Sequence, residues 1–129
     1  MRALSQIRQI DYTVIFARDL KAMRHFYEDV MEFPRWRSLS DRWLEYRVGS
    51  TTLVLTAYAA RFNDEPPAPG ALSLQLAFRV PPRAVAECAE VLAAKGVALI
   101  SPMTDHPFGH RTIFFRDPDG NVIEIFAEI

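Results

Sequence analysis

The sequence predicts an α+β fold built from two consecutive βαβββ modules, and three observations support this prediction. A segment rich in β-formers is followed by a helical apolar stripe twice, once near the start and once after the middle. Each half then ends in two extended segments around a turn, at Gly49-Ser50 and at Gly120. A proline-rich segment at about 61–70 separates the halves. The modules are therefore expected at about 7–60 and 71–129.

The first module opens with a predicted strand over 10–16, where β-branched and aromatic residues dominate. Asp19 then has the side chain of a helix N-cap. Pro34 ends the helical region that follows. A hairpin is then predicted from two strands, at residues 42–48 and 51–56. The apolar residues of the helix recur at helical spacing and are Leu20, Met23, Phe26, Tyr27, Val30 and Met31.

The second module repeats this order, although its residue identity with the first is low. A strand over 72–80 leads to a helix that begins at Pro81-Pro82 and is capped by Gly96. Its apolar stripe is Val85, Cys88, Val91 and Leu92. Extended structure is expected to resume at 97–100. The closing hairpin is expected to join strands 111–116 and 121–126 through Asp117-Pro118-Asp119-Gly120, which has the form of a type I turn.

Length and charge restrict the function. With 129 residues and 14.7 kDa, the chain is expected to form one domain over 1–129. Its 15 basic and 16 acidic residues predict no binding to nucleic acid or to an anionic membrane. No apolar run reaches the roughly 18 residues of a spanning helix, and the start lacks a signal-peptide core, so a cytoplasmic location is expected. The single cysteine, Cys88, excludes an intrachain disulfide.

Alternation along the predicted strands separates an apolar side from a more polar one. Residues 74, 76, 78 and 80 are apolar and are expected to meet the helix, while Gln75 falls on the other side. In the last strand, Glu124 is opposed to Ile123 and Ile125. A lone acid at this place either faces solvent or lines a ligand cavity, and the alternation leaves both alternatives open.

The chain resembles the vicinal oxygen chelate superfamily, which includes glyoxalase I, bleomycin-resistance proteins and extradiol dioxygenases. The resemblance covers nearly the whole chain, in the segments 10–14, 18–20, 26–27, 74–80 and, most specifically, 115–124, which reads Phe-Arg-Asp-Pro-Asp-Gly-Asn-Val-Ile-Glu. It implies two βαβββ modules whose mixed sheets curl around a cavity. It also implies metal ligands on the first and last strands of each module, and commonly a homodimer.

Position by position, the resemblance places the usual metal ligands of the family at Tyr12, at or next to Val54, at Gln75 and at Glu124. Of these, only Glu124 is the usual residue, since Val54 has no donor atom and Tyr12 would have to lose a proton with a reference pKa of about 10. We therefore expect no resident cofactor. A weakly held divalent metal at Gln75 and Glu124 stays open, because some glyoxalase-like proteins use glutamine as a ligand.

Without a metal, Tyr12, Gln75 and Glu124 form a set of groups suited to a polar small molecule. His110, in the loop before a strand, is the better histidine candidate for this site; His106 is an alternative, and both are equally explained as exposed loop residues. If the cavity is dry, desolvation should raise the pKa of Glu124 and suit it to general-base catalysis. A plain hydrogen bond between Tyr12 and Glu124 is the structural alternative.

Two functional classes follow. The first is a metal-independent small-molecule binding protein of the bleomycin-resistance kind, and the second is a metal-dependent lyase, isomerase or dioxygenase that uses Glu124 with Gln75 and Tyr12. The missing donors favour the first. Four arginines surround the two tryptophans, and they fit an anionic ligand, a partner chain or a solvated strand edge equally well. They are Arg35, Arg37, Arg42 and Arg47.

Overall fold

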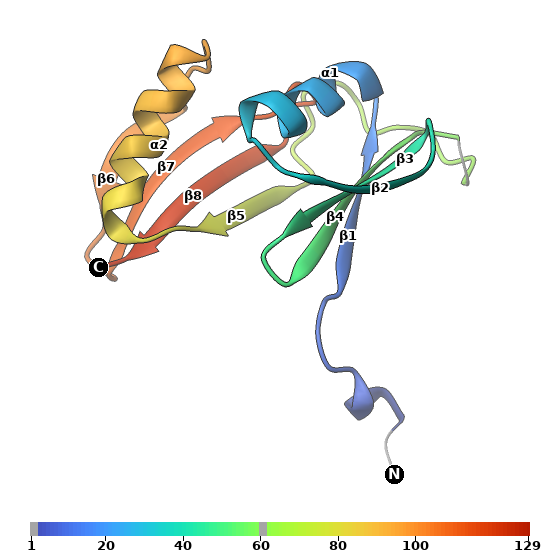
Figure 1. The fold of residues 1–129 in the computed structure, drawn as a ribbon, viewed down its shortest axis with the longest axis horizontal. Helices are drawn as coiled ribbons and strands as arrows, with labels where there is room; N and C mark the ends of the chain where they lie inside the picture. Colours follow the sequence, from blue (N-terminus) through green and yellow to red (C-terminus); the bar gives the residue numbers. More distant parts are fainter. Residues whose placement is uncertain (1–2, 60–61) are drawn as a thin grey trace. The chain divides into compact units, whose positions relative to one another are not determined.

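The chain folds into two compact units, Met1–Glu65 and Pro66–Ile129, each with one four-stranded mixed sheet and its own helical segment (Figure 1). The computed structural model describes residues 3–59 and 62–129. The expected end of the first module at residue 60 and the first linker residue, 61, lie outside the described residues. Residues 62–70 form neither strand nor helix, as their prolines predict.

The first unit contains the sheet order β1-β4-β3-β2, in which β1 runs parallel to β4 and the other pairs are antiparallel. Its buried side chains come from α1, η2 and the three strands β1, β3 and β4, and include Met23, Tyr27, Tyr46 and Leu55. The elements are η1 (Ala3–Gln6), β1 (Tyr12–Ala17), α1 (Leu20–His25), η2 (Phe26–Val30), β2 (Arg35–Ser40), β3 (Trp43–Val48) and β4 (Thr51–Ala57).

The second unit repeats this topology with the sheet order β5-β8-β7-β6, again with one parallel pair. Its helix α2 packs on β6, β7 and β8 through Val85 and Leu92, which are buried. The elements are β5 (Gln75–Arg79), α2 (Pro82–Ala94), β6 (Ser101–Asp105), β7 (His110–Arg116) and β8 (Val122–Glu128). The predicted α+β class and the pair of βαβββ modules are confirmed.

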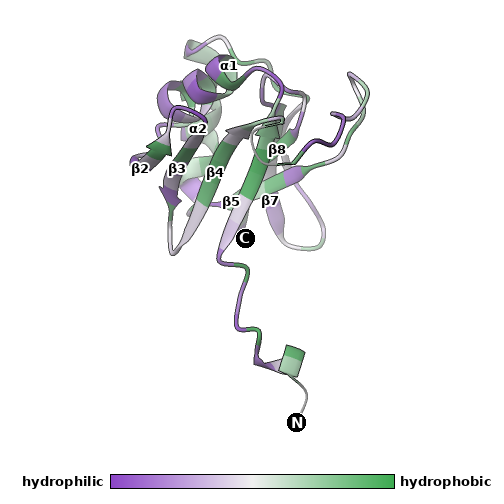
Figure 2. Ribbon diagram, turned by 90° about the vertical axis from the view of Figure 1, so that its right-hand side faces the viewer, coloured by the Kyte–Doolittle hydropathy of each residue, from purple (hydrophilic) through white to green (hydrophobic). Residues whose placement is uncertain are grey.

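The central strands carry the apolar cores. Figure 2 shows long hydrophobic stretches in β4 and β8, each of which lies between two neighbours in its sheet. Ile113, Phe115 and Ile123 are fully buried on the side of the second sheet that meets α2. Burial of such side chains stabilises a fold by about 1.5–3 kcal/mol each.

The first helix begins where the sequence predicts and ends in an unexpected geometry. The carboxylate of Asp19 accepts a hydrogen bond from the backbone N–H of Ala22 at 3.0 Å. After one α-helical segment the chain widens into a π-helix, in which the N–H of Met31 donates to the carbonyl of Phe26. This wider turn buries the consecutive residues Phe26 and Tyr27 together, with their rings 5.0 Å apart.

The two turns of the second unit form as predicted. Gly96 follows α2 with a φ of 81°, a left-handed value that favours glycine at a helix end. In the closing hairpin the N–H of Gly120 donates to the carbonyl of Asp117 at 2.9 Å. The carboxylate of Asp117 is buried and accepts hydrogen bonds from the backbone of Asp119 and from the backbone and side chain of Asn121. This turn fixes where β8 begins.

Two strands differ from the expectation. β2 was not predicted, because all six of its residues are exposed and it lies at a sheet edge with register shifts, so it has no apolar alternation. The expected extended segment 97–100 is wrong: the strand there, β6, begins at Ser101. The N–H of Val97 still donates to the carbonyl of Leu92, so these residues complete the helix end before the sheet resumes.

Among the described residues, no helix has both the length and the apolar character needed to cross a membrane.

Candidate functional sites on the two sheets

In the second unit, the sheet side opposite α2 carries most of the predicted site. We call this side the second open face. Register places its residues on one side, because Ala77 pairs with Glu124, Phe114 with Glu124, and Thr112 with Phe126. The face consists of Gln75, Arg79, His110, Thr112, Phe114, Glu124 and Phe126.

Gln75 and Glu124 lie in contact on this face. The side-chain amide nitrogen of Gln75 donates to Oε1 of Glu124 at 3.0 Å, across the parallel pair β5 and β8. Glu124 is half-buried, and its Oε2 has no hydrogen-bond or ion-pair partner within residues 3–59 and 62–129. The amide of Gln75 therefore orients the carboxylate and leaves one of its oxygens available to a ligand.

His110 lies on the same face within a row of contacting rings. Its ring is stacked on that of Phe126, with the centroids 4.9 Å apart, and meets Phe108 edge to face at 5.3 Å. At one end of the row, His106 stacks on Phe108 at 4.9 Å and its Nε2 is 2.8 Å from the hydroxyl of Thr112. At the other end, the guanidinium of Arg79 lies 4.9 Å from the Phe126 ring centroid and pairs with Glu128 at 3.1 Å. The row offers an aromatic surface beside Glu124.

Tyr12 belongs to the first unit, on the sheet side opposite α1. We call this side the first open face. Tyr12 is 56% exposed on β1 and shares the face with Val54 of β4, which is buried. Register places the following residues there: Tyr12, Val14, Thr52, Val54, Trp43, Glu45 and Arg47, with Arg37 of β2 beside Glu45.

Glu45 is a buried carboxylate that the sequence reasoning missed. It is the register partner of Val54, so it stands one strand away from the position where the family's first-module acid was expected. Its Oε1 accepts from Nε of Arg37 at 3.1 Å, and its Oε2 accepts from Nε1 of Trp43 at 2.8 Å. The signal in the sequence was an acid alternating with aromatic residues in a predicted strand, which is the same signal that singled out Glu124.

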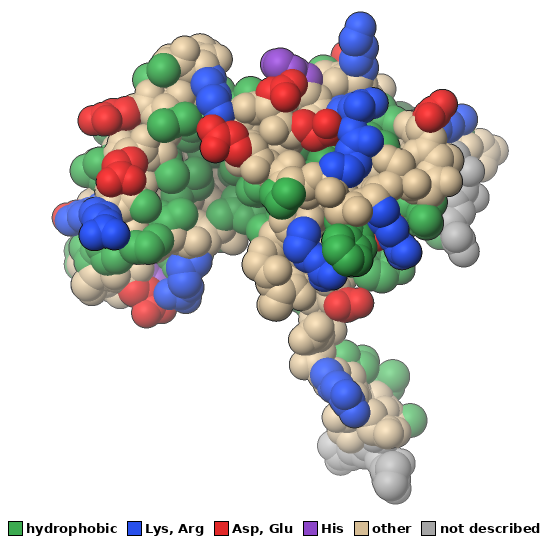
Figure 3. Space-filling view, in the orientation of Figure 1, with side chains coloured by type: hydrophobic (Ala, Val, Ile, Leu, Met, Phe, Trp, Pro, Cys, Tyr) green, Lys and Arg blue, Asp and Glu red, His purple; other side chains and the backbone are tan. Residues whose placement is uncertain are grey.

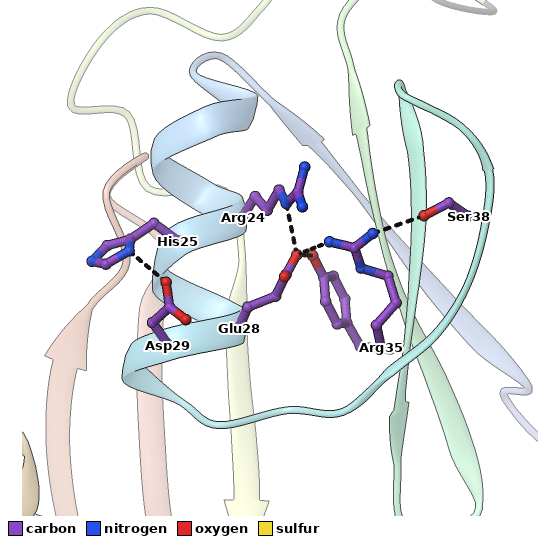
Figure 4. Close-up of polar contacts among 7 residues, drawn as sticks. Arg24, His25, Glu28, Asp29, Arg35 and Ser38 are labelled. Atoms are coloured by element: carbon purple, nitrogen blue, oxygen red, sulfur yellow. Dashed lines mark hydrogen bonds and ion pairs between the residues drawn. The ribbon is translucent and has the colours of Figure 1, made fainter.

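A partly buried polar network lies on the helix side of the first sheet (Figure 4). Oε2 of Glu28, in η2, accepts hydrogen bonds from the hydroxyl of Tyr46 at 2.7 Å and from Arg35 at 2.6 Å. Arg24 donates to the same oxygen at 3.0 Å. Burial alone would raise the pKa of Glu28, but the Tyr46 hydroxyl and the two guanidinium groups prevail and lower it.

The pKa of the Tyr46 hydroxyl is raised. The main cause is burial of the phenol, and the hydrogen bond that it donates to the Glu28 carboxylate adds to the effect. Tyr46 is therefore held as a donor. Since this network ties η2 to β2 and β3, its role is to join helix and sheet. Periodicity does not reveal it, because its members come from four elements with no common spacing.

The donor atoms do not fit a firmly held divalent metal. On the second open face, the expected ligand positions supply one amide and one carboxylate, which are bonded to each other. On the first, Val54 supplies none, and both oxygens of Glu45 are engaged by an arginine and a tryptophan. Divalent ions need several oxygen or nitrogen donors, and a neighbouring guanidinium opposes a second cation. Within the described ranges, no three His, Cys, Asp or Glu side chains are grouped to hold a metal.

The charged surface contains both signs. Figure 3 shows Lys and Arg side chains interspersed with Asp and Glu on the face in view. This mixture agrees with the formal net charge of −1 and provides no broad basic surface for a polyanion.

Two βαβββ units, each with a sheet that has a polar and aromatic open face, define the class of this protein. Comparison with known families identifies that class. Residues 9–125 match the family model described as the Glyoxalase/Bleomycin resistance protein/Dioxygenase superfamily. The chain belongs to this superfamily.

Solved structures agree with the fold. A lactoylglutathione lyase from Agrobacterium tumefaciens is 25% identical with a TM-score of 0.75, covering 95% of both chains. A glyoxalase/dioxygenase from Nostoc punctiforme is 19% identical with a TM-score of 0.80, covering 100% of this chain and 97% of that one. A glyoxalase/bleomycin resistance protein/dioxygenase from Nocardioides is 22% identical with a TM-score of 0.78, covering 96% and 85%. No curated protein matches the sequence significantly.

Proposed function

We propose that this protein binds a polar small molecule at the second open face without a resident metal. The observation that carries the proposal is the free Oε2 of Glu124, held in place by Gln75 beside the ring row of Phe126 and His110. A carboxylate oxygen accepts hydrogen bonds from hydroxyl or amine groups, and stacked rings accept a flat apolar part. Tyr12, on the first unit, is proposed as a further ligand-binding residue.

The proposal is tested by replacing Glu124 with Gln. A thermal-shift screen of small molecules on the wild-type protein should find ligands that raise the melting temperature, because a ligand that binds only the folded state stabilises it. Glu124→Gln should abolish that rise. Glu90→Gln, an exposed acid of α2, is the matched control and should preserve the rise. Equal ligand responses in the wild-type and Glu124→Gln proteins would count against the proposal.

Catalysis with Glu124 as the general base is a second candidate, favoured by the same free oxygen. In this case Glu124→Gln abolishes turnover while Gln75→Ala reduces it, since Gln75 only orients the carboxylate. A general-base enzyme of this kind works without a metal, whereas the alternative enzyme of the superfamily requires one. Metal analysis of protein purified without chelator, paired with activity after addition of Fe(II), Mn(II), Ni(II) or Zn(II), makes the distinction. Near-stoichiometric metal or metal-dependent turnover would refute metal-independent function.

We also propose that the protein acts in the cytoplasm as a homodimer. The superfamily membership supports the dimer, and several large apolar side chains are exposed among the described residues of the single chain. They include Leu39, Leu72, Ile100 and Met103. Light scattering after gel filtration should give twice the mass of 14.7 kDa. A single-chain mass at micromolar protein would contradict the dimer.

A further inference from the structure

We propose that the first open face holds a second binding site, selective for a planar aromatic carboxylate. Five residues form it, two from β2 and three from β3: Trp36, Arg37, Trp43, Glu45 and Arg47. All five residues lie in the first unit, and neither Tyr12 nor Glu124 is among them, so this site does not depend on the function proposed for Glu124.

Arg47 and Trp36 supply the first half of this site. The guanidinium carbon of Arg47 lies 4.3 Å from the centroid of the Trp36 ring, and this ring is 53% exposed. The guanidinium of Arg47 has no ion pair or hydrogen bond within the described part of the chain. Stacking uses the flat side of a guanidinium, so its N–H groups stay available to an acceptor.

Arg37 supplies a second donor that is fixed in place. Its Nε donates to Glu45, which leaves its two Nη groups without a partner among residues 3–59 and 62–129. Glu45 is 7% exposed and is held on its other oxygen by Trp43, so it anchors Arg37 on the face. A guanidinium oriented in this way loses little side-chain entropy when it binds a carboxylate.

Charge and spacing then select the ligand. Arg37 and Arg47 are cationic and Glu45 is anionic, which leaves one net positive charge on the face. Glu45 and Arg47 are two positions apart on β3, about 7 Å along a strand, and Arg37 is the register partner of Glu45. Two guanidinium groups at this separation can bind one carboxylate, and the exposed Trp36 offers a ring on which an aromatic group can stack.

An arginine of the second unit that also lies on an aromatic ring lacks this chemistry. Arg79 also lies on an aromatic ring, that of Phe126, but it is paired with Glu128. Its charge is already neutralised, whereas that of Arg47 is not. The free cation is thus a property of the first face and does not follow from the shared fold.

Binding of 2-naphthoate tests the inference. The chain has two tryptophans, so the two indole N–H signals in a ¹⁵N–¹H NMR spectrum report directly on Trp36 and Trp43. Adding 2-naphthoate should shift the Trp36 signal. The neutral analogue 2-naphthamide should bind at least about tenfold more weakly, because a charge-assisted hydrogen bond contributes on the order of that factor.

Variants locate the site. Arg47→Gln should weaken 2-naphthoate binding by at least about tenfold, and Trp36→Leu should weaken it while leaving the charge intact. Arg83→Gln removes an exposed positive charge from α2 and should leave the affinity unchanged. Glu124→Gln should also leave it unchanged, which separates this site from the one proposed on the second open face.

Four outcomes would overturn the inference. They are no binding of 2-naphthoate at millimolar concentration, equal binding of 2-naphthamide, equal weakening by Arg83→Gln and Arg47→Gln, and loss of binding in Glu124→Gln.

Discussion

The two units share a topology and differ in how polar groups support it. In the first, a partly buried carboxylate, Glu28, joins the helical segment to two strands through Tyr46 and Arg35. In the second, α2 packs on its sheet through apolar residues, and the buried carboxylate, Asp117, lies in the hairpin turn. The same fold therefore places an acid that accepts several hydrogen bonds either between helix and sheet or within a turn. Each acid is retained by the hydrogen bonds that it accepts.

The largest expected effect comes from the turn. Asp117→Ala removes three hydrogen bonds from a buried acceptor and should lower the free energy of unfolding by about 3 kcal/mol. Ser50→Ala is the matched control in the corresponding turn of the first unit, where the side chain is exposed, and should change it by less than about 0.5 kcal/mol. Urea denaturation measures both. Equal losses of unfolding free energy in Asp117→Ala and Ser50→Ala would show that the buried carboxylate does not distinguish the turn of the second unit from that of the first.

The next effect concerns the joint between η2 and the first sheet. Tyr46→Phe removes the hydroxyl that donates to Glu28 and should destabilise the protein by about 1–2 kcal/mol. Tyr58→Phe is the control, because this half-buried tyrosine makes a ring contact with Phe16 at 5.9 Å and no hydroxyl contact to the described residues. Denaturant titration of the two variants is the measurement. A loss in Tyr58→Phe as large as that in Tyr46→Phe would show that the hydroxyl of Tyr46 does not strengthen the joint.

The pH dependence of stability refines this comparison. The folded protein lowers the pKa of Glu28 below its usual value of 4.5, so the folded state favours the carboxylate. The stabilisation is present above the unfolded pKa and is lost as the pH falls through the folded pKa. The stability difference between wild type and Glu28→Gln should therefore shrink as the pH falls below about 4.5. A pH-independent difference would contradict this linkage.

The smallest effect is expected from an exposed ion pair of the second unit. Asp105 and Arg111 form two hydrogen bonds, of 2.7 and 3.0 Å, and the bonds to Arg111 lower the pKa of Asp105. Because solvent screens this pair, Arg111→Gln should leave the denaturation midpoint unchanged within error at physiological salt. A shift as large as that of Tyr46→Phe would show that burial does not explain the difference between the two networks.

The sequence predicted which residues of the candidate site share a face, but not the contacts between them. Glu124 and Gln75 could be placed on one side of neighbouring strands, because alternation is a local property of extended chain. Their hydrogen bond depends on the register of β5 with β8, which the sequence reasoning did not specify. Glu45 was missed because its contact with Arg37 depends on the pairing of β2 with β3, and β2 was not predicted.

Local sequence signals were enough to predict the Asp19 cap, the turn at Asp117, the helix end at Gly96 and the repeated order of strands and helices. Tertiary structure decided the exposed edge strand β2, the π-helical turn after His25 and the start of β6 at Ser101. It also decided which carboxylates are neutralised. Edge pairing, helix widening and charge neutralisation depend on partners distant in sequence, and such partners meet only when the sheet assembles.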